Sequence, residues 1–301
     1  MESMPVLLLF VITMSACLIG SLLRAWYGKN TPQSTAGYHL FNAASSLFCA
    51  LLLLVLGGAQ RPSLFTLLLG IGFGIAVAGN LIANTAALAI GPISYTSLII
   101  SLSTVITALS GALFWHETLR LTQIIGILLM VVCLILSVKK DEGEGKAKTV
   151  RWFLLSVIAC LFNGAIGILQ KVHQSSAHRD ELMAFLAVSF GFSFLFSTVC
   201  LLFSLRGGKK EALRLPSVPD KKKALLLLAV FAVVGICTAL NHVINLYLAG
   251  IVESAVFFPI VNGGGLILLT LSSFILFHEK LTRRQTIGLL VGFAAVLLLC
   301  L

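Results

Sequence analysis

The amino-acid sequence predicts an all-α integral membrane protein with ten transmembrane helices, arranged as two inverted five-helix repeats. Of its 301 residues, 58% are hydrophobic and 11% are charged, whereas soluble domains carry roughly 25% charged residues. The chain also contains ten apolar runs, most of them near the roughly 20 residues that a helix needs to cross the hydrocarbon core. Finally, a motif that ends the fourth run recurs at the end of the ninth.

The ten apolar runs follow one another closely and leave no room for a soluble domain. They lie near residues 6–27, 34–57, 63–88, 92–115, 121–138, 151–172, 181–205, 223–248, 252–277 and 283–301. The first run is long, no Lys or Arg precedes it, and basic residues follow it. We therefore expect it to be a retained transmembrane helix rather than a signal peptide.

The repeated motif divides the chain into two modules. Residues 115–126 and 277–288, which are 162 residues apart, are identical at six of twelve positions, including a His-Glu pair. A repeat of this length indicates two copies of one module, which we place at residues 1–145 and 146–301. The exposed linker between them is expected in the charged stretch 139–151.

The odd number of predicted spans in each module sets their relative orientation. Because five spans carry the chain across the membrane an odd number of times, the two modules are expected to be inverted. Inverted repeats are typical of alternating-access transporters, whose binding site lies between the halves near the midplane of the bilayer.

The basic residues predict an orientation in the membrane. The chain has a formal net charge of +10, and 17 of its 21 Lys and Arg residues follow odd-numbered runs, Arg24 and Lys29 among them. The positive-inside rule places those connections in the cytoplasm and both termini outside. We expect a multi-pass protein of the cell membrane that contacts the lipid bilayer and a small-molecule solute, binds no nucleic acid, and is a monomer or homodimer.

The cysteines do not predict a metal site or a disulfide. All seven fall inside apolar runs and none shows the spacing of metal ligands. They are Cys17, Cys49, Cys133, Cys160, Cys200, Cys237 and Cys300. We interpret them as small apolar side chains and expect the protein to need no cofactor.

Two pairs of asparagines are the main candidates for a binding site. Asn80 and Asn84 share one face of the third run, and Asn241 and Asn245 repeat that face in the eighth. An amide in the hydrocarbon core is costly unless it finds a polar partner or water. The pairs indicate a pseudo-symmetric site at the midplane; alternatively, they hold the third and eighth helices to their neighbours.

Other runs add further candidates for the same site. Asn262 follows Pro259, which is expected to kink the ninth helix, and interrupted helices expose polar groups to transporter cavities. Asn163 is the better-placed amide of the sixth run, and Ser101 belongs to a small-residue face of the fourth that serves either packing or binding.

Aromatic candidates come from the second and eighth runs. Tyr38 and Asn42 lie four residues apart on one helical face, where they form either a cavity wall or an anchor at the membrane interface. Tyr247 is expected to add a ring and a hydroxyl group to the site.

The repeated His-Glu motifs have a structural interpretation. Glu117 and Glu279 lie at the ends of helices, where negative charge opposes the helix dipole. Compensation is expected from Thr118 or Arg120 in the first module. We expect these glutamates to stabilise the turn between paired helices rather than contact solute.

The chain has a family resemblance that depends on three features. They are the helix that ends on Glu117-Thr118-Leu119, its copy at Glu279-Lys280-Leu281, and the two sets of five spans. They resemble the EamA-type branch of the drug/metabolite transporter superfamily. The resemblance implies a solute carrier with a central cavity lined by helices 1 to 4 and 6 to 9, while helices 5 and 10 are peripheral or mediate association. Members of that superfamily carry amino acids, nucleotide sugars, phosphorylated sugars, choline and drugs.

The expected solute follows from the charge of the candidate residues. Amides carry no net charge, so we expect a neutral or zwitterionic solute rather than a strong anion or a cation. No Lys or Arg is expected deep in a span, which argues against a phosphate-bearing solute. A polytopic membrane enzyme is an alternative, but it would need a nucleophile with a base, or a metal cluster, within the spans. A receptor or scaffold is a third possibility.

Overall fold

Helices make up the regular secondary structure that is described for this chain. The computed structural model describes residues 5–30, 34–58, 61–117, 120–137, 146–206, 221–254 and 283–300, together with parts of 256–272. No strand occurs among these residues. The helices are α1 (Val6–Asn30), α2 (Thr35–Gly57), α3 (Leu64–Ile90), α4 (Ile93–Ser101), α5 (Ser103–Trp115), α6 (Leu121–Ser137), α7 (Lys146–Gln174), the 3-10 turn η1 (Arg179–Glu181), α8 (Leu182–Arg206), α9 (Lys221–Ile251) and α11 (Arg283–Cys300).

Within the described ranges, seven helical segments are long and apolar enough to cross a membrane. They are Val6–Asn30, Thr35–Gly57, Leu64–Ile90, Tyr95–Trp115, Thr149–Gln174, Arg179–Arg206 and Lys221–Ile251. α6 and α11, with 17 and 18 residues, are outside this group, and the predicted span 252–277 is only partly described. The all-helical class of a multi-pass membrane protein is therefore confirmed, while the count of ten spans stays a prediction.

The first helix is longer than predicted. α1 continues to Asn30 because its apolar face continues: Ala25 and Tyr27 are fully buried, and the Tyr27 hydroxyl donates to the carbonyl of Gly37 at 2.8 Å. Arg24, which the sequence placed in a cytoplasmic connection, instead lies inside α1 with 8% of its surface exposed. Its assignment to a solvated loop is wrong.

The fourth predicted span is interrupted. The sequence indicates one long helix over 92–115, but the structure has α4 and α5 separated at Leu102. The Leu102 amide bonds to the carbonyl of Ile99, three residues back, at 3.1 Å. This tighter turn replaces the four-residue spacing of an α-helix.

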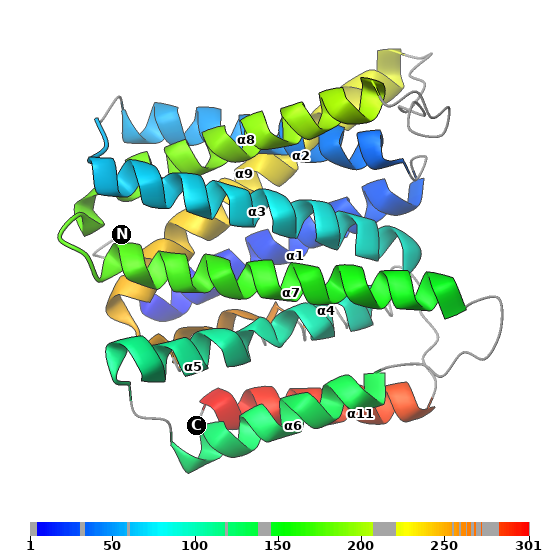
Figure 1. Cartoon of the computed structure of the whole chain (residues 1–301), viewed down its shortest axis with the longest axis vertical. Helices are drawn as coiled ribbons and strands as arrows, with labels where there is room; N and C mark the ends of the chain where they lie inside the picture. The colour runs from blue at the N-terminus through cyan, green and yellow to red at the C-terminus, as the bar shows by residue number, and fades with distance from the viewer. Residues whose placement is uncertain are drawn as a thin grey trace.

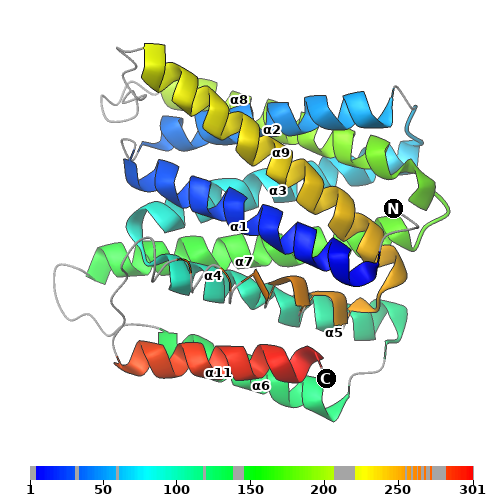
Figure 2. The same cartoon turned by 180° about the vertical axis from the view of Figure 1, so that it is seen from behind.

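The helices pack as matched pairs from the two halves of the chain. α2 packs on α8, and α6 packs on α11. Further contacts come in exchanged pairs. α1 lies on α9 where α3 lies on α7, and α3 lies on α8 where α9 lies on α2. In Figures 1 and 2 the helices α1, α2, α3 and α6 run in the opposite direction to α7, α8, α9 and α11 respectively. The start of α1 and the end of α11 lie at the same end of the bundle in both views.

Glycines allow the closest of these contacts. A Cβ added to Gly74 of α3 would collide with the carbonyl oxygen of Ser189 and lie 3.1 Å from Phe192 in α8. A Cβ added to Gly235 of α9 would lie 2.7 Å from the carbonyl oxygen of Ser45 and 2.6 Å from Phe48 in α2. The two contacts use the same residue types. Glycines of α3 and α9 therefore bring helix backbones together.

We expect Gly74→Ala to lower the free energy of unfolding by about 1 to 3 kcal/mol, because the methyl group would overpack the contact with the α8 backbone. Gly72→Ala is the matched control on the same helix, since a Cβ there meets nothing within 4 Å. Thermal unfolding of the purified variants in detergent measures both. Equal thermal stability of the two variants would contradict the close contact.

Candidate functional site

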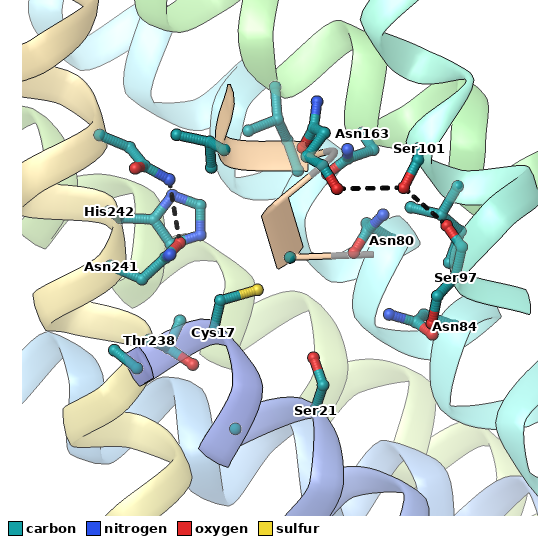
Figure 3. Close-up of a pocket in the computed structure, with 18 of the residues that line it drawn as sticks. Cys17, Ser21, Asn80, Asn84, Ser97, Ser101, Asn163, Thr238, Asn241 and His242 are labelled. Atoms are coloured by element: carbon teal, nitrogen blue, oxygen red, sulfur yellow. Dashed lines mark hydrogen bonds between the residues drawn. The ribbon is translucent and has the colours of Figure 1, made fainter. Parts of the chain in front are cut away.

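A cavity lies between the two halves of the helical bundle. Its volume is about 200 Å³, and its described walls come from α1, α3, α4, α7, α9 and residues 257–265 (Figure 3). The helices α2, α6, α8 and α11 contribute none of the described lining. Pockets for drug-sized ligands measure roughly 300 to 1,000 Å³, so this cavity fits a smaller molecule.

Seven of the residues proposed from sequence line this one cavity. They are Asn80, Asn84, Ser101, Asn163, Asn241, Asn245 and Asn262. In the first half they come from α3 and α4, whereas in the second half Asn163 comes from α7 and Asn241 and Asn245 come from α9. Figure 3 shows the labelled members of this set converging from different helices, together with Cys17 and Ser21 of α1.

Three proposed residues lie elsewhere. Tyr38 lines a separate cavity of about 60 Å³ beside Arg151, and Asn42 is fully buried in α2 with no hydrogen-bond partner for its amide in the described structure. Tyr247 packs against an apolar cluster near the start of α1. Tyr38 and Asn42 miss the cavity because α2 packs on α8 and α9. The resemblance implied that the second and seventh predicted spans, which are α2 and α8 in the structure, line the cavity. The described lining contains no residue of either helix.

Several cavity amides also tie helices together. The Asn80 amide nitrogen donates to the carbonyl of Ala159 in α7 at 2.9 Å. Asn163 donates to the hydroxyl of Ser103 at 2.7 Å. Asn262 donates to the hydroxyl of Thr104 at 3.0 Å. Each of these bonds removes the cost of an unpaired amide in the bundle interior.

The second asparagine pair forms a network with α1. The Thr13 hydroxyl donates to the Asn245 side-chain oxygen at 2.8 Å, and the Asn241 side chain donates to the Thr13 hydroxyl at 2.9 Å. Asn245 in turn donates to the Asn241 side-chain oxygen at 3.1 Å. The alternative that these amides hold neighbouring helices therefore applies to this pair.

Asn84 differs from the other amides. It lines the cavity and is partly exposed, yet its side chain makes no hydrogen bond to another described residue. Its amide is available to a bound molecule without breaking a contact between helices.

The cavity includes polar residues that the sequence did not single out. They are Cys17, Ser21, Arg24, Gln170, Thr238 and His242. A signal was present, because Cys17, Ser21 and Arg24 have the same spacing in α1 as Asn163, Gly167 and Gln170 have in α7. Gln170 reaches the cavity because α7 continues to Gln174.

One end of the cavity carries a positive charge. Only 8% of the surface of Arg24 is exposed, and its Nε has no hydrogen-bond partner among the described residues. The expectation that no basic residue lies deep in a span is therefore wrong. No Asp or Glu occurs among the described lining residues.

His242 contributes a ring to the opposite half of the cavity. Its Nδ1 lies 3.5 Å from the Gln170 amide nitrogen. The ring stands edge-on to Phe190, with centroids 5.1 Å apart, and to Phe73 at 5.7 Å. These contacts fix the orientation of the imidazole at the cavity wall.

The His-Glu motif of the first module lies outside the cavity. The Glu117 carboxylate pairs with the ammonium of Lys171 in α7 at 3.1 Å and accepts a long bond of 3.5 Å from the Ser254 amide. The compensating charge thus comes from Lys171, and Thr118 and Glu279 lie outside the described residues. These contacts hold α5 against α7 and the segment that begins at Ser254, in line with a structural role.

Asn84→Leu and Asn245→Leu separate binding from packing. We expect Asn84→Leu to abolish solute binding with little change in thermal stability, because no helix contact is lost. Asn245→Leu should lower stability by about 0.6 to 2 kcal/mol for each bond broken. Thermal unfolding together with solute uptake by reconstituted protein measures the difference. Near-normal uptake by Asn84→Leu would remove Asn84 from the site.

The comparisons with known proteins bear on the fold alone. No protein-family model and no curated protein matches the chain. A solved structure named only "Crystal structure of protein" matches with a TM-score of 0.60 and 16% sequence identity, over 96% of this chain and 97% of its own length. The likeness extends along nearly the whole of both chains and concerns the fold.

Proposed function

We propose that this protein is a secondary transporter that moves a small polar or amphipathic organic solute across the membrane by alternating access. In this proposal it is a ten-helix carrier of the EamA type built from two inverted repeats. The observation that carries the proposal is the central polar cavity, whose walls come from matching helices of both halves.

The packing supports the inverted repeat. Gly74 and Gly235 are 161 residues apart and meet the same residue types on α8 and α2. The Ser101 hydroxyl donates to the carbonyl of Asn262, also 161 residues away, at 3.3 Å. A direct contact between equivalent positions is expected close to a twofold axis. Alternating-access carriers place their solute site between such repeats.

Two apolar clusters lie toward opposite ends of the bundle, and we call them plug 1 and plug 2. Plug 1 joins the start of α1, the end of α9 and the segment around Phe257; its buried members are Leu9, Phe10, Ile244, Leu248, Ala249, Phe257, Phe258 and Val261. Plug 2 joins the end of α3, α4 and the first half of α7; its buried members are Ala87, Tyr95, Leu98, Ile99, Trp152 and Cys160. Exchanging the halves of the chain turns one plug into the other. α1 and α7 begin at opposite ends of the bundle (Figure 1), and each plug contains the first part of one of these helices. The two plugs therefore lie toward opposite ends.

The plugs suggest how access alternates. Opening plug 1 while plug 2 stays packed would admit solute from one side, and the reverse movement would release it on the other. A carrier needs two such states separated by only a few kcal/mol. Related contacts at the two ends make such a balance natural, since each state would lose one plug and keep its counterpart.

Transport itself is tested by reconstituting the purified protein in liposomes. A carrier accumulates or equilibrates a labelled metabolite from a mixed panel, and mass spectrometry recovers that metabolite chemically unchanged. Recovery of a modified product would instead favour a membrane enzyme. Liposomes without protein serve as the control for leakage.

Truncating one plug should bias the protein toward one open state. With Cys17 as the sole cysteine, we expect Leu248→Ala in plug 1 and Leu98→Ala in plug 2 to accelerate labelling by a membrane-impermeant thiol reagent from opposite sides. Leu→Ala in a packed core costs about 2 to 5 kcal/mol, enough to raise the open population at least about tenfold. Right-side-out and inverted vesicles report the two sides. Acceleration from the same side in both variants would contradict alternating access.

A further inference from the structure

Arg24 is a buried charge that is unpaired in the described structure. It lines the cavity with 8% of its surface exposed, and its Nε lacks a hydrogen-bond partner there. A guanidinium stays charged in proteins and offers five donors in a fixed fork. Burying such a charge is costly unless an opposite charge or polar groups compensate for it. An ionisable side chain inside a membrane bundle is accordingly a candidate functional group.

The described residues that line the cavity supply no counter-charge for Arg24. The described cavity lining contains amides, hydroxyls, thiols and His242, but no Asp or Glu. The one carboxylate ion pair described between helical elements, Glu117 with Lys171, lies outside the cavity lining.

Arg24 also differs from the residue at the matching position in the other half of the chain. Its counterpart by spacing in α7 is Gln170, which is neutral and lies beside His242. The two ends of the cavity are therefore electrically different, although their helices match. Packing between repeats does not require this difference, because Gln occupies the equivalent position.

The neighbouring helix places Arg24 near an open amide. Gly28, one turn further along α1, packs closely on α3, where an added Cβ would lie 3.3 Å from that of Ala89. Leu88 directly precedes Ala89 near the end of α3, and Asn84 lies about one helical turn before Leu88. Both line the same cavity as Arg24. A molecule held by the guanidinium would thus have Asn84 within its reach.

We propose that Arg24 binds the carboxylate group of the transported solute, so that the solute is a small carboxylic acid or an amino-acid-like zwitterion. This inference rests on the proposed carrier function and names its substrate class. A carboxylate matches the guanidinium fork with two parallel hydrogen bonds. A single positive charge neutralises a carboxylate, whereas a phosphate monoester carries a charge of about −1.5 to −2 at pH 7 and would stay under-compensated. Solutes without an anionic group leave Arg24 unpaired.

The first test measures the electric field of Arg24 without a solute. With Cys17 as the sole cysteine, the labelling rates of an anionic sulfonate and a cationic trimethylammonium methanethiosulfonate are compared. Cys17 and Arg24 line the same cavity, so we expect the anionic reagent to be favoured, relative to its ratio with free cysteine, by about tenfold. Arg24→Gln should remove that preference. Lys29→Gln, which deletes the same charge from an exposed position of α1, should keep it.

The second test uses four matched probes that compete with labelling of Cys17. They are butyrate, L-2-aminobutyrate, butyramide and butyl phosphate. We expect protection by one or both of the carboxylates, weak protection by the phosphate ester and none by the amide. Arg24→Gln should lose the protection, and Arg24→Lys, which keeps the charge without the fork, should retain part of it. Size-exclusion chromatography checks that each variant is folded.

The outcomes separate this inference from the carrier function. Three outcomes overturn the role of Arg24: protection by butyramide equal to that by the carboxylates, protection by none of the probes, or an unchanged reagent preference in Arg24→Gln. Alternating access of the plugs can still hold in each of these cases. Stronger protection by butyl phosphate than by the carboxylates overturns the choice of carboxylate. Arg24-dependent protection by carboxylates in a protein whose plugs do not alternate would keep the binding site and remove the transport.

Discussion

Close backbone contact at the glycines of α3 and α9 is the constraint on which the rest of the structure depends. At Gly74 and Gly235 these two helices approach α8 and α2 so closely that no side chain fits between them. In a membrane, where lipid is as apolar as the helix surfaces, such packing replaces the hydrophobic effect as the source of helix association. With one face of α3 and of α9 held in this way, another face, which carries the asparagines, is left to the cavity.

The polar interior follows from the same packing. An enclosed amide without a partner is costly, and several cavity amides find one on a neighbouring helix: Asn80 on α7, and Asn241 and Asn245 on Thr13 of α1. The hydrogen bonds therefore hold the cavity walls as well as line them. Against this background, Asn84 and Arg24 stand apart as lining groups whose bonding capacity the described helices leave open, and both belong to the first half of the chain.

In the proposed carrier, a site between two repeats combines symmetry with selectivity. Related apolar plugs toward both ends allow two states of similar free energy, which a carrier needs in order to face either side. Recognition of one solute, in contrast, requires groups that the repeats do not share. In the proposed carrier, Arg24 of α1 and Gln170 of α7, which occupy matching positions and both line the cavity, supply such a difference.

The sequence by itself determined the membrane class, the positions of most helices and the polar faces of α3 and α9, because hydrocarbon length and the cost of buried amides are local constraints that a single chain segment must obey. Only the tertiary structure decided which polar residues share a cavity. Tyr38 and Asn42 fit a cavity wall by spacing, but α2 turns them toward other helices. The sequence placed Arg24 in a basic loop. In the structure it lies in the cavity wall, because Ala25 and Tyr27 are buried and α1 continues beyond Arg24. Spacing along one helix defines a face, whereas the neighbours of that face depend on contacts between segments far apart in the chain.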